Sequence, residues 1–131
     1  MPALVTSLYA ALLGMLCIVL SGMVGQARGK FNVPLGDSGK PDIILANRRH
    51  MNFVENVPLA LILIGFAELN GASSIWIHCL GGTLLLARLI HPFGLSIEKI
   101  MVPARIIGAG LTVLVQLAAS ITLLWQHFAF R

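Results

Sequence analysis

The first uncharged run of the chain limits what it can fold into. No residue from Ala3 to Val24 carries a charge, and about 20 apolar residues, rising about 1.5 Å each, cross the ~30 Å hydrocarbon core of a bilayer as a helix. A cleaved signal peptide fits less well, because the start Met-Pro-Ala-Leu has no positive charge and the run exceeds a typical signal segment. We therefore expect a transmembrane helix here.

The composition extends this expectation to the whole chain. Of the 131 residues, 57% are hydrophobic and 11% are charged, whereas an ordinary soluble domain carries about 25% charged residues. These values argue against a soluble enzyme and against a disordered chain. The net charge of +4 comes without a basic run, so no nucleic-acid partner is expected.

Three more apolar segments follow, separated by turn-forming residues. The second is expected to begin at about Asp42 as its N-cap and to end at Leu69. Glycine and proline mark loops at Gly25–Pro41 and Pro92–Pro103, and Asn70–Ser73 forms a turn. The predicted spans are about 3–24, 42–69, 74–91 and 103–128. The fold class is therefore all-α, an integral membrane four-helix bundle that forms a single domain over residues 1–131.

Basic residues indicate the orientation in the membrane. Eight of the nine Lys and Arg residues lie in or beside the first and third loops, and only Arg131 lies at the other face. The positive-inside rule then places these loops in the cytoplasm and both termini on the non-cytoplasmic side. Tyr9, Trp76 and Trp125 lie towards the face of the termini, as interfacial aromatic anchors do.

A polar stripe marks the second span. At about 100° per residue, Arg48, Asn52 and Glu55 fall within an arc of about 60°. Arg88 and His91 share a face of the third span, and Arg105 begins the fourth. The list of candidate site residues at the cytoplasmic level is thus Arg48, Asn52, Glu55, Arg88, His91 and Arg105.

The surplus of arginine over glutamate in this set favours an anionic ligand. Guanidinium groups bind carboxylates through forked hydrogen bonds, and arginine beside a bound thiol favours the reactive thiolate. Glu55 can pair with an arginine or accept from a ligand ammonium group. A small zwitterionic or acidic ligand that enters from the cytoplasm fits this chemistry.

Less specific interpretations remain open for the same residues. Arg48 and Arg49 can be snorkelling anchors at the interface, and Glu55 with one arginine can be an ion pair that only stabilises the bundle. No metal site is predicted, because no pair among His50, Glu55 and His91 has a recognised ligand spacing. The glycines of 108–110 lack the rest of a nucleotide fingerprint, so they indicate helix packing.

The second span also carries a family resemblance. The segment Arg48-Arg49-His50-Met51-Asn52-Phe53-Val54-Glu55-Asn56-Val57-Pro58 has the pattern Arg-x-His-x-Asn-x-x-Glu-x-x-Pro. It resembles the signature of the MAPEG family, the membrane-associated proteins in eicosanoid and glutathione metabolism. The resemblance covers essentially the whole chain, with Ala87-Arg88 and Pro103-Ala104-Arg105, and is greatest to the small members of the bacterial inner membrane.

The resemblance implies a homotrimer that binds glutathione as a co-substrate between neighbouring subunits on the cytoplasmic side. Residues matching Arg48, Asn52 and Glu55 contact glutathione in such proteins. The match to Arg88 lies in or near that site, and the match to Arg105 stabilises the thiolate. Arg28 is matched to a further glutathione-contacting arginine.

Two functions follow from this resemblance as alternatives. The first is a membrane-embedded, glutathione-dependent transferase or peroxidase that acts on a small lipophilic electrophile from the bilayer, with Arg105 as the catalytic residue. The second is a non-catalytic protein of the same fold that binds lipids or partners, because family tyrosines are replaced here by His91, Leu95 and Asn56. A proton-coupled exporter of similar size would need a carboxylate in the first span, which has none.

Overall fold

The part of the chain that the structure describes forms four helices. The computed structural model describes residues 2–96, 98 and 102–129, and its helices are α1 (Leu4–Phe31), α2 (Pro41–Leu69), α3 (Ser74–Gly94) and α4 (Pro103–Ala129). Each is long and apolar enough to cross a membrane. The predicted all-α fold with four membrane spans is therefore confirmed.

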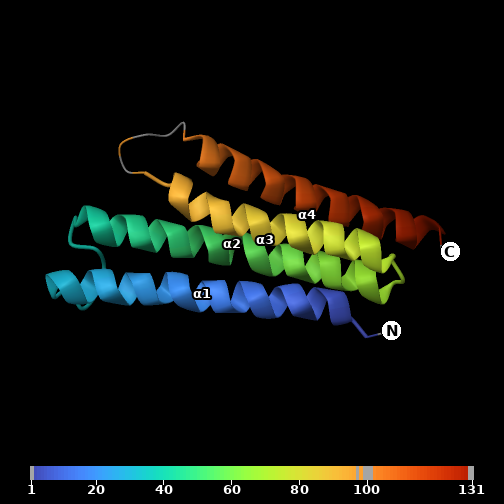
Figure 1. Cartoon of the computed structure of the whole chain (residues 1–131), viewed down its shortest axis with the longest axis horizontal. Coiled ribbons are helices and arrows are strands. Elements are labelled where there is room, and N and C mark those ends of the chain that lie inside the picture. The colour runs from blue at the N-terminus through green and yellow to red at the C-terminus, as the bar shows by residue number, and fades with distance from the viewer. Residues whose placement is uncertain (1, 97, 99–101, 130–131) are drawn as a thin grey trace.

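The helices run lengthwise as an antiparallel bundle (Figure 1). α2 and α3 form its middle, since each contacts the other and both outer helices, whereas α1 and α4 do not contact each other within the described residues. The α1–α2 connection, the end of α3 and the start of α4 lie at one end, which we call the loop end. Both termini and the α2–α3 turn lie at the other, the terminal end.

Apolar side chains are divided between the core and the outer surface. Leu13, Ile64, Ile77 and Leu84 are fully buried where the helices meet. Large apolar side chains also cover the outer faces of the bundle, with Ile18 as one example at 74% exposed. An outer surface of this kind is stable against lipid rather than water.

α1 is longer than the sequence predicts. It continues beyond Val24 to Phe31, so the first part of the predicted loop Gly25–Pro41 is helical. A glycine costs a helix only about 1 kcal/mol, and Gly25 therefore does not end this one. The helix ends at Asn32, which adopts a left-handed conformation with φ of 53°.

Two other predicted boundaries were wrong by a few residues. The N-cap of α2 is Lys40 rather than Asp42, and Pro41 is the first helical residue, where its missing N–H costs nothing. The Asp42 carboxylate instead pairs with Lys30 Nζ at 2.8 Å. α3 continues through Pro92 to Gly94 instead of ending at His91.

Glu68 connects the end of α2 to the start of α1. Its carboxylate accepts hydrogen bonds from the backbone N–H groups of Val5, at 2.9 Å, and Thr6, at 2.7 Å. The first N–H groups of a helix have no partner within the helix, and a negative charge there also interacts favourably with the helix dipole. Glu68 therefore caps α1 from another helix.

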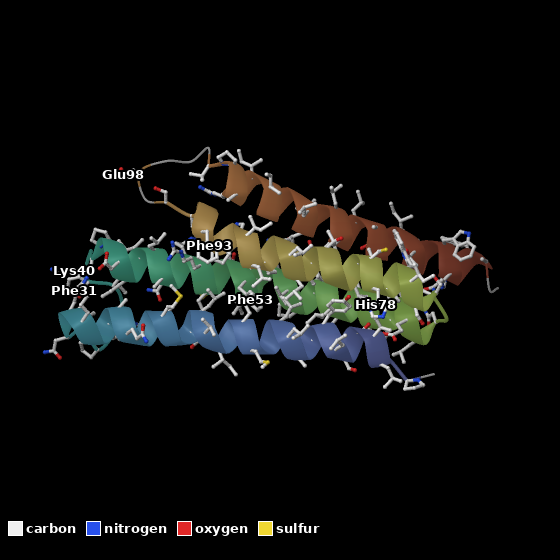
Figure 2. All side chains as sticks on the ribbon, viewed as in Figure 1. Phe31, Lys40, Phe53, His78, Phe93 and Glu98 are labelled. Carbon is white, nitrogen blue, oxygen red and sulfur yellow. The ribbon has the colours of Figure 1, made fainter. Side chains whose placement is uncertain are left out.

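We expect Glu68→Ala to lower the free energy of unfolding by about 1–2 kcal/mol, because the two N–H groups lose their acceptor. Unfolding by sodium dodecyl sulfate in mixed micelles, followed by circular dichroism, measures the change. Glu98→Ala, which removes an exposed carboxylate in the α3–α4 connection (Figure 2), is the matched control and should shift stability by less than about 0.5 kcal/mol. Equal stability of the two variants would contradict the capping role.

Candidate functional site

A cavity of about 290 Å³ lies at the loop end, between α2, the end of α3 and the start of α4. We call it the arginine cavity. Its lining residues are Ile44, Leu45, Arg48, Asn52, His91, Leu95, Ser96 and Arg105. Four of the seven candidate site residues from the sequence therefore meet in one place, although they come from three helices.

Two glycines allow α3 and α4 to meet closely enough to form the cavity. A Cβ atom at Gly94 would collide with the backbone of Arg105. A Cβ atom at Gly108 would lie 2.7 Å from His91 Cβ and 2.9 Å from Ala87 O. This close approach places Arg105, at the start of α4, beside His91 near the end of α3.

Arg88 supports the cavity without lining it. Its side chain is 2% exposed, and it donates from Nη1 to Asn52 Oδ1 at 2.9 Å and from Nη2 to Gly108 O at 3.0 Å. Nη2 also contacts Thr112 Oγ1, whose hydroxyl donates to Gly108 O. The guanidinium thus joins α3 to α2 and α4, and it orients the Asn52 side chain that lines the cavity.

The charge of the cavity is positive. Arg48 and Arg105 are both at its wall, and no carboxylate lines it among the residues that the structure describes. Arg48 is exposed, while His91 is buried at 3% exposed. Two guanidinium groups, an amide and an imidazole around one space can bind an anion with several oxygen atoms.

Glu55 and Arg28 lie outside the arginine cavity. Glu55 is exposed on the outer surface of α2, and the described part of the chain contains one ion pair, which joins Lys30 and Asp42. The ion pair between Glu55 and an arginine, left open by the sequence, is therefore not formed within one described chain. Arg28 is half-buried in a separate hollow beside Pro34 at the same end.

The sequence left Arg49 open as an interfacial anchor, and in the structure its Nε donates to Pro92 O at 2.8 Å near the end of α3. Two other residues of this region were not singled out by sequence analysis. Thr112 contacts Arg88, and Ser96 lines the cavity. The available signal for Thr112 was its spacing of four residues from Gly108, which places both on one face of α4.

Comparison with known proteins settles the family. The model of the MAPEG family matches residues 6–125. This chain belongs to the MAPEG family. It is 38% identical over 91 residues, or 70% of each chain, to the inner membrane protein YecN of Escherichia coli K12, and equally to YecN of Escherichia coli O6:H1 strain CFT073. No solved structure matches it.

Family membership agrees with the sequence motif and with the membrane-spanning helices. The resemblance predicted from the segment Arg48–Pro58 is confirmed. With four apolar helices and an inner membrane relative, this MAPEG protein is an integral protein of the inner membrane. Of the three positions at which the resemblance implied replaced tyrosines, His91 and Leu95 both line the arginine cavity, whereas the Asn56 amide donates to Asn52 O at 2.8 Å.

The close contact at Gly108 predicts opposite effects for two neighbouring glycines. Gly108→Ala should lower the free energy of unfolding by about 1–3 kcal/mol, because α4 must move away from His91. Gly110, with nothing near its Cβ position, is the matched control, and Gly110→Ala should raise stability by up to about 1 kcal/mol through helix propensity. The detergent titration proposed for Glu68 measures both, and effects of the same sign would contradict the α3–α4 contact.

Proposed function

We propose that this MAPEG protein is a membrane-embedded, glutathione-dependent transferase or peroxidase that acts on lipophilic electrophiles. One observation carries the proposal: Arg48, Asn52, His91 and Arg105 surround one cavity that no described carboxylate lines. Glutathione has two carboxylates, an ammonium group and a thiol, so its net negative charge complements this lining. At about 290 Å³, the cavity is near the lower end of the usual size of ligand sites, about 300–1,000 Å³.

Arg48 and Asn52 are the proposed binding residues, and Arg105 the catalytic one. The forked guanidinium of Arg48 pairs with a carboxylate of the peptide. The charge of Arg105 stabilises the glutathione thiolate after the thiol proton passes to water.

In the transferase reaction, the thiolate sulfur bonds to an electrophilic carbon, and a leaving group departs or a proton is added. In peroxidase chemistry, two glutathione molecules reduce a hydroperoxide to an alcohol and water and become a disulfide.

Assembly as a homotrimer belongs to the same proposal. Glu55 lies midway along α2, about 21 Å from either end at about 1.5 Å per residue, and it is exposed. A carboxylate facing lipid at this depth costs a few kcal/mol or more. A neighbouring subunit with bound glutathione removes that cost, because Glu55 then accepts from the ligand ammonium group. Arg28 of the same loop end contributes to the shared site in this arrangement.

The loop end faces the cytoplasm in the proposed orientation. Arg28, Arg48, Arg49 and Arg105 lie towards this end of the bundle, and Figure 2 shows Lys40 there as well. By the positive-inside rule, both termini are then on the non-cytoplasmic side. This orientation gives the arginine cavity access to cytosolic glutathione.

A second function, non-catalytic binding of a lipid or a partner, has one observation in its favour. Two cavity positions where family members can carry tyrosine hold His91 and Leu95 here. Leu95 offers no hydroxyl group to a ligand, and His91 offers one imidazole in place of a phenol. Saturable lipid binding by a protein that binds no glutathione would favour this function.

Equilibrium binding of reduced glutathione to the purified protein in nanodiscs, measured by calorimetry, tests the site. Arg48→Ala and Arg105→Ala should each weaken binding by about tenfold or more, because each removes a hydrogen bond between charged groups. Glu55→Ala should weaken it too if the ammonium group is bound there. Lys40→Ala removes an exposed charge at the same end and should leave affinity unchanged. Absence of saturable binding at cytosolic concentrations would rule out the proposed site.

Turnover separates the catalytic role of Arg105 from binding. Conjugation of chlorodinitrobenzene at saturating glutathione should fall by about tenfold or more in Arg105→Ala, since the thiolate loses its neighbouring charge. The ultraviolet absorbance of bound thiolate should fall in parallel, and Arg105→Lys should restore part of both signals. Equal rates in Arg105→Ala and the unsubstituted protein would refute this role.

A further inference from the structure

A second cavity, of about 510 Å³, lies at the terminal end, far from the arginine cavity. It is formed by the α2–α3 turn, the start of α3 and the last turns of α4. We call it the tryptophan cavity, because Trp76 and Trp125 both line it, together with Ser73, Ile121, Thr122 and Gln126 among others. None of these residues takes part in the proposed glutathione chemistry. Figure 2 marks this end of α3 with His78.

Gln126 lines this cavity and carries a buried acceptor. The side chain is 3% exposed, and its Nε2 donates to Ala67 O at 3.0 Å and to Asn70 O at 3.5 Å. Both partners are carbonyl oxygens, so the amide must present its nitrogen to them and its oxygen elsewhere. Among the described residues, Oε1 is buried and has no hydrogen-bond partner. An unsatisfied buried acceptor is costly, and a ligand donor would remove that cost.

Most of the remaining wall is apolar, and hydrogen bonds hold one of its indoles in place. Trp76 Nε1 donates to Thr122 Oγ1 at 3.0 Å, and the Thr122 hydroxyl donates to Ala118 O at 2.8 Å. These bonds orient the Trp76 indole and satisfy its only donor, so its ring is presented to the cavity as apolar surface. Ile121 adds an aliphatic contact from α4.

The polar groups select the type of ligand. No Lys or Arg lines the cavity in the part of the chain that the structure describes, so a phosphate or carboxylate finds no counter-charge. Ser73 Oγ accepts from Trp76 N at 3.3 Å, which leaves its hydroxyl hydrogen to donate. A hydroxyl group, which both donates and accepts, complements Gln126 Oε1 and the Ser73 hydroxyl.

We propose that the tryptophan cavity binds an uncharged amphiphile, whose hydroxyl group donates to Gln126 Oε1 and whose hydrocarbon chain packs against Trp76 and Trp125. The volume is within the range of sites for small molecules, about 300–1,000 Å³. The cavity lies beside the turn that joins two membrane spans. This level of the membrane suits a molecule with one polar and one apolar part.

The two tryptophans of the chain both line this cavity, so intrinsic tryptophan fluorescence reports on it directly. The probe is the monoglyceride of dibrominated stearic acid, added to the protein in unbrominated phosphatidylcholine nanodiscs, because bromine quenches indole fluorescence on contact. The methyl ester of the same acid has no hydrogen-bond donor and is the matched ligand control. We expect saturable quenching by the monoglyceride and only shallow, non-saturating quenching by the ester. Identical curves for the two ligands would overturn the proposal.

Substitutions on α4 test the acceptor. Gln126→Leu should weaken the apparent affinity for the monoglyceride by about fivefold or more, which is the value of one hydrogen bond. Gln116→Leu is the matched control, because Gln116 also donates to a carbonyl of α2, Asn56 O at 3.0 Å, but lies outside the cavity, and it should leave the affinity unchanged. If both variants reduce quenching equally, the proposal fails.

A third variant keeps the test decisive if Gln126→Leu does not fold. Ile121→Phe retains Gln126 and reduces the space beside it at an exposed position of α4. Saturable quenching should become weaker in this variant while helix content stays the same. Unchanged quenching would show that the monoglyceride contacts the indoles from bulk lipid. Glutathione is absent from these measurements, so their outcome is independent of the function proposed above.

Discussion

The buried guanidinium of Arg88 is the constraint on which the loop end of the bundle depends. A cation enclosed by helices in a membrane cannot be solvated by water, so it must be satisfied by fixed acceptors. Asn52 on α2 and Gly108 and Thr112 on α4 provide them for Nη1 and Nη2, whereas Nε has no partner among the described residues. These contacts determine how α2 and α4 sit relative to α3, and a shift of one helix by a single turn would leave the charge without partners.

The two ends of the bundle present different chemistry on the same scaffold. The loop end has the arginine cavity, with two guanidinium groups at its wall. The terminal end has the tryptophan cavity, with two indoles and a buried amide oxygen. In the proposed orientation, the difference reflects membrane physics, because basic residues concentrate on the cytoplasmic side while tryptophan is stable at either interface. Under the two proposals above, one short chain has a site for a charged ligand and a separate site for an uncharged one.

Helix boundaries show where local signals compete. Gly25 and Pro41 were both predicted to lie in a loop, but both are helical. α1 continues through Gly25 to Phe31, and Pro41 is the first residue of α2. A single glycine costs a helix little, whereas proline at the first helical position is compatible with helix formation. Similarly, α3 passes through Pro92, whose carbonyl accepts from Arg49. The position of a helix boundary therefore depends on the sum of small local free energies and on contacts with other helices.

The sequence by itself determined the membrane environment, the four spans and the family, because these follow from hydrophobic length and from the motif at Arg48–Pro58. It also brought Arg48, Asn52, His91 and Arg105 to one level of the bundle. Only the tertiary structure decided that these four residues line one cavity, while Arg88 lies behind it and Glu55 faces outward. The rotation of each helix about its axis depends on contacts between distant residues, such as Gly108 with His91, which periodicity within one helix does not encode.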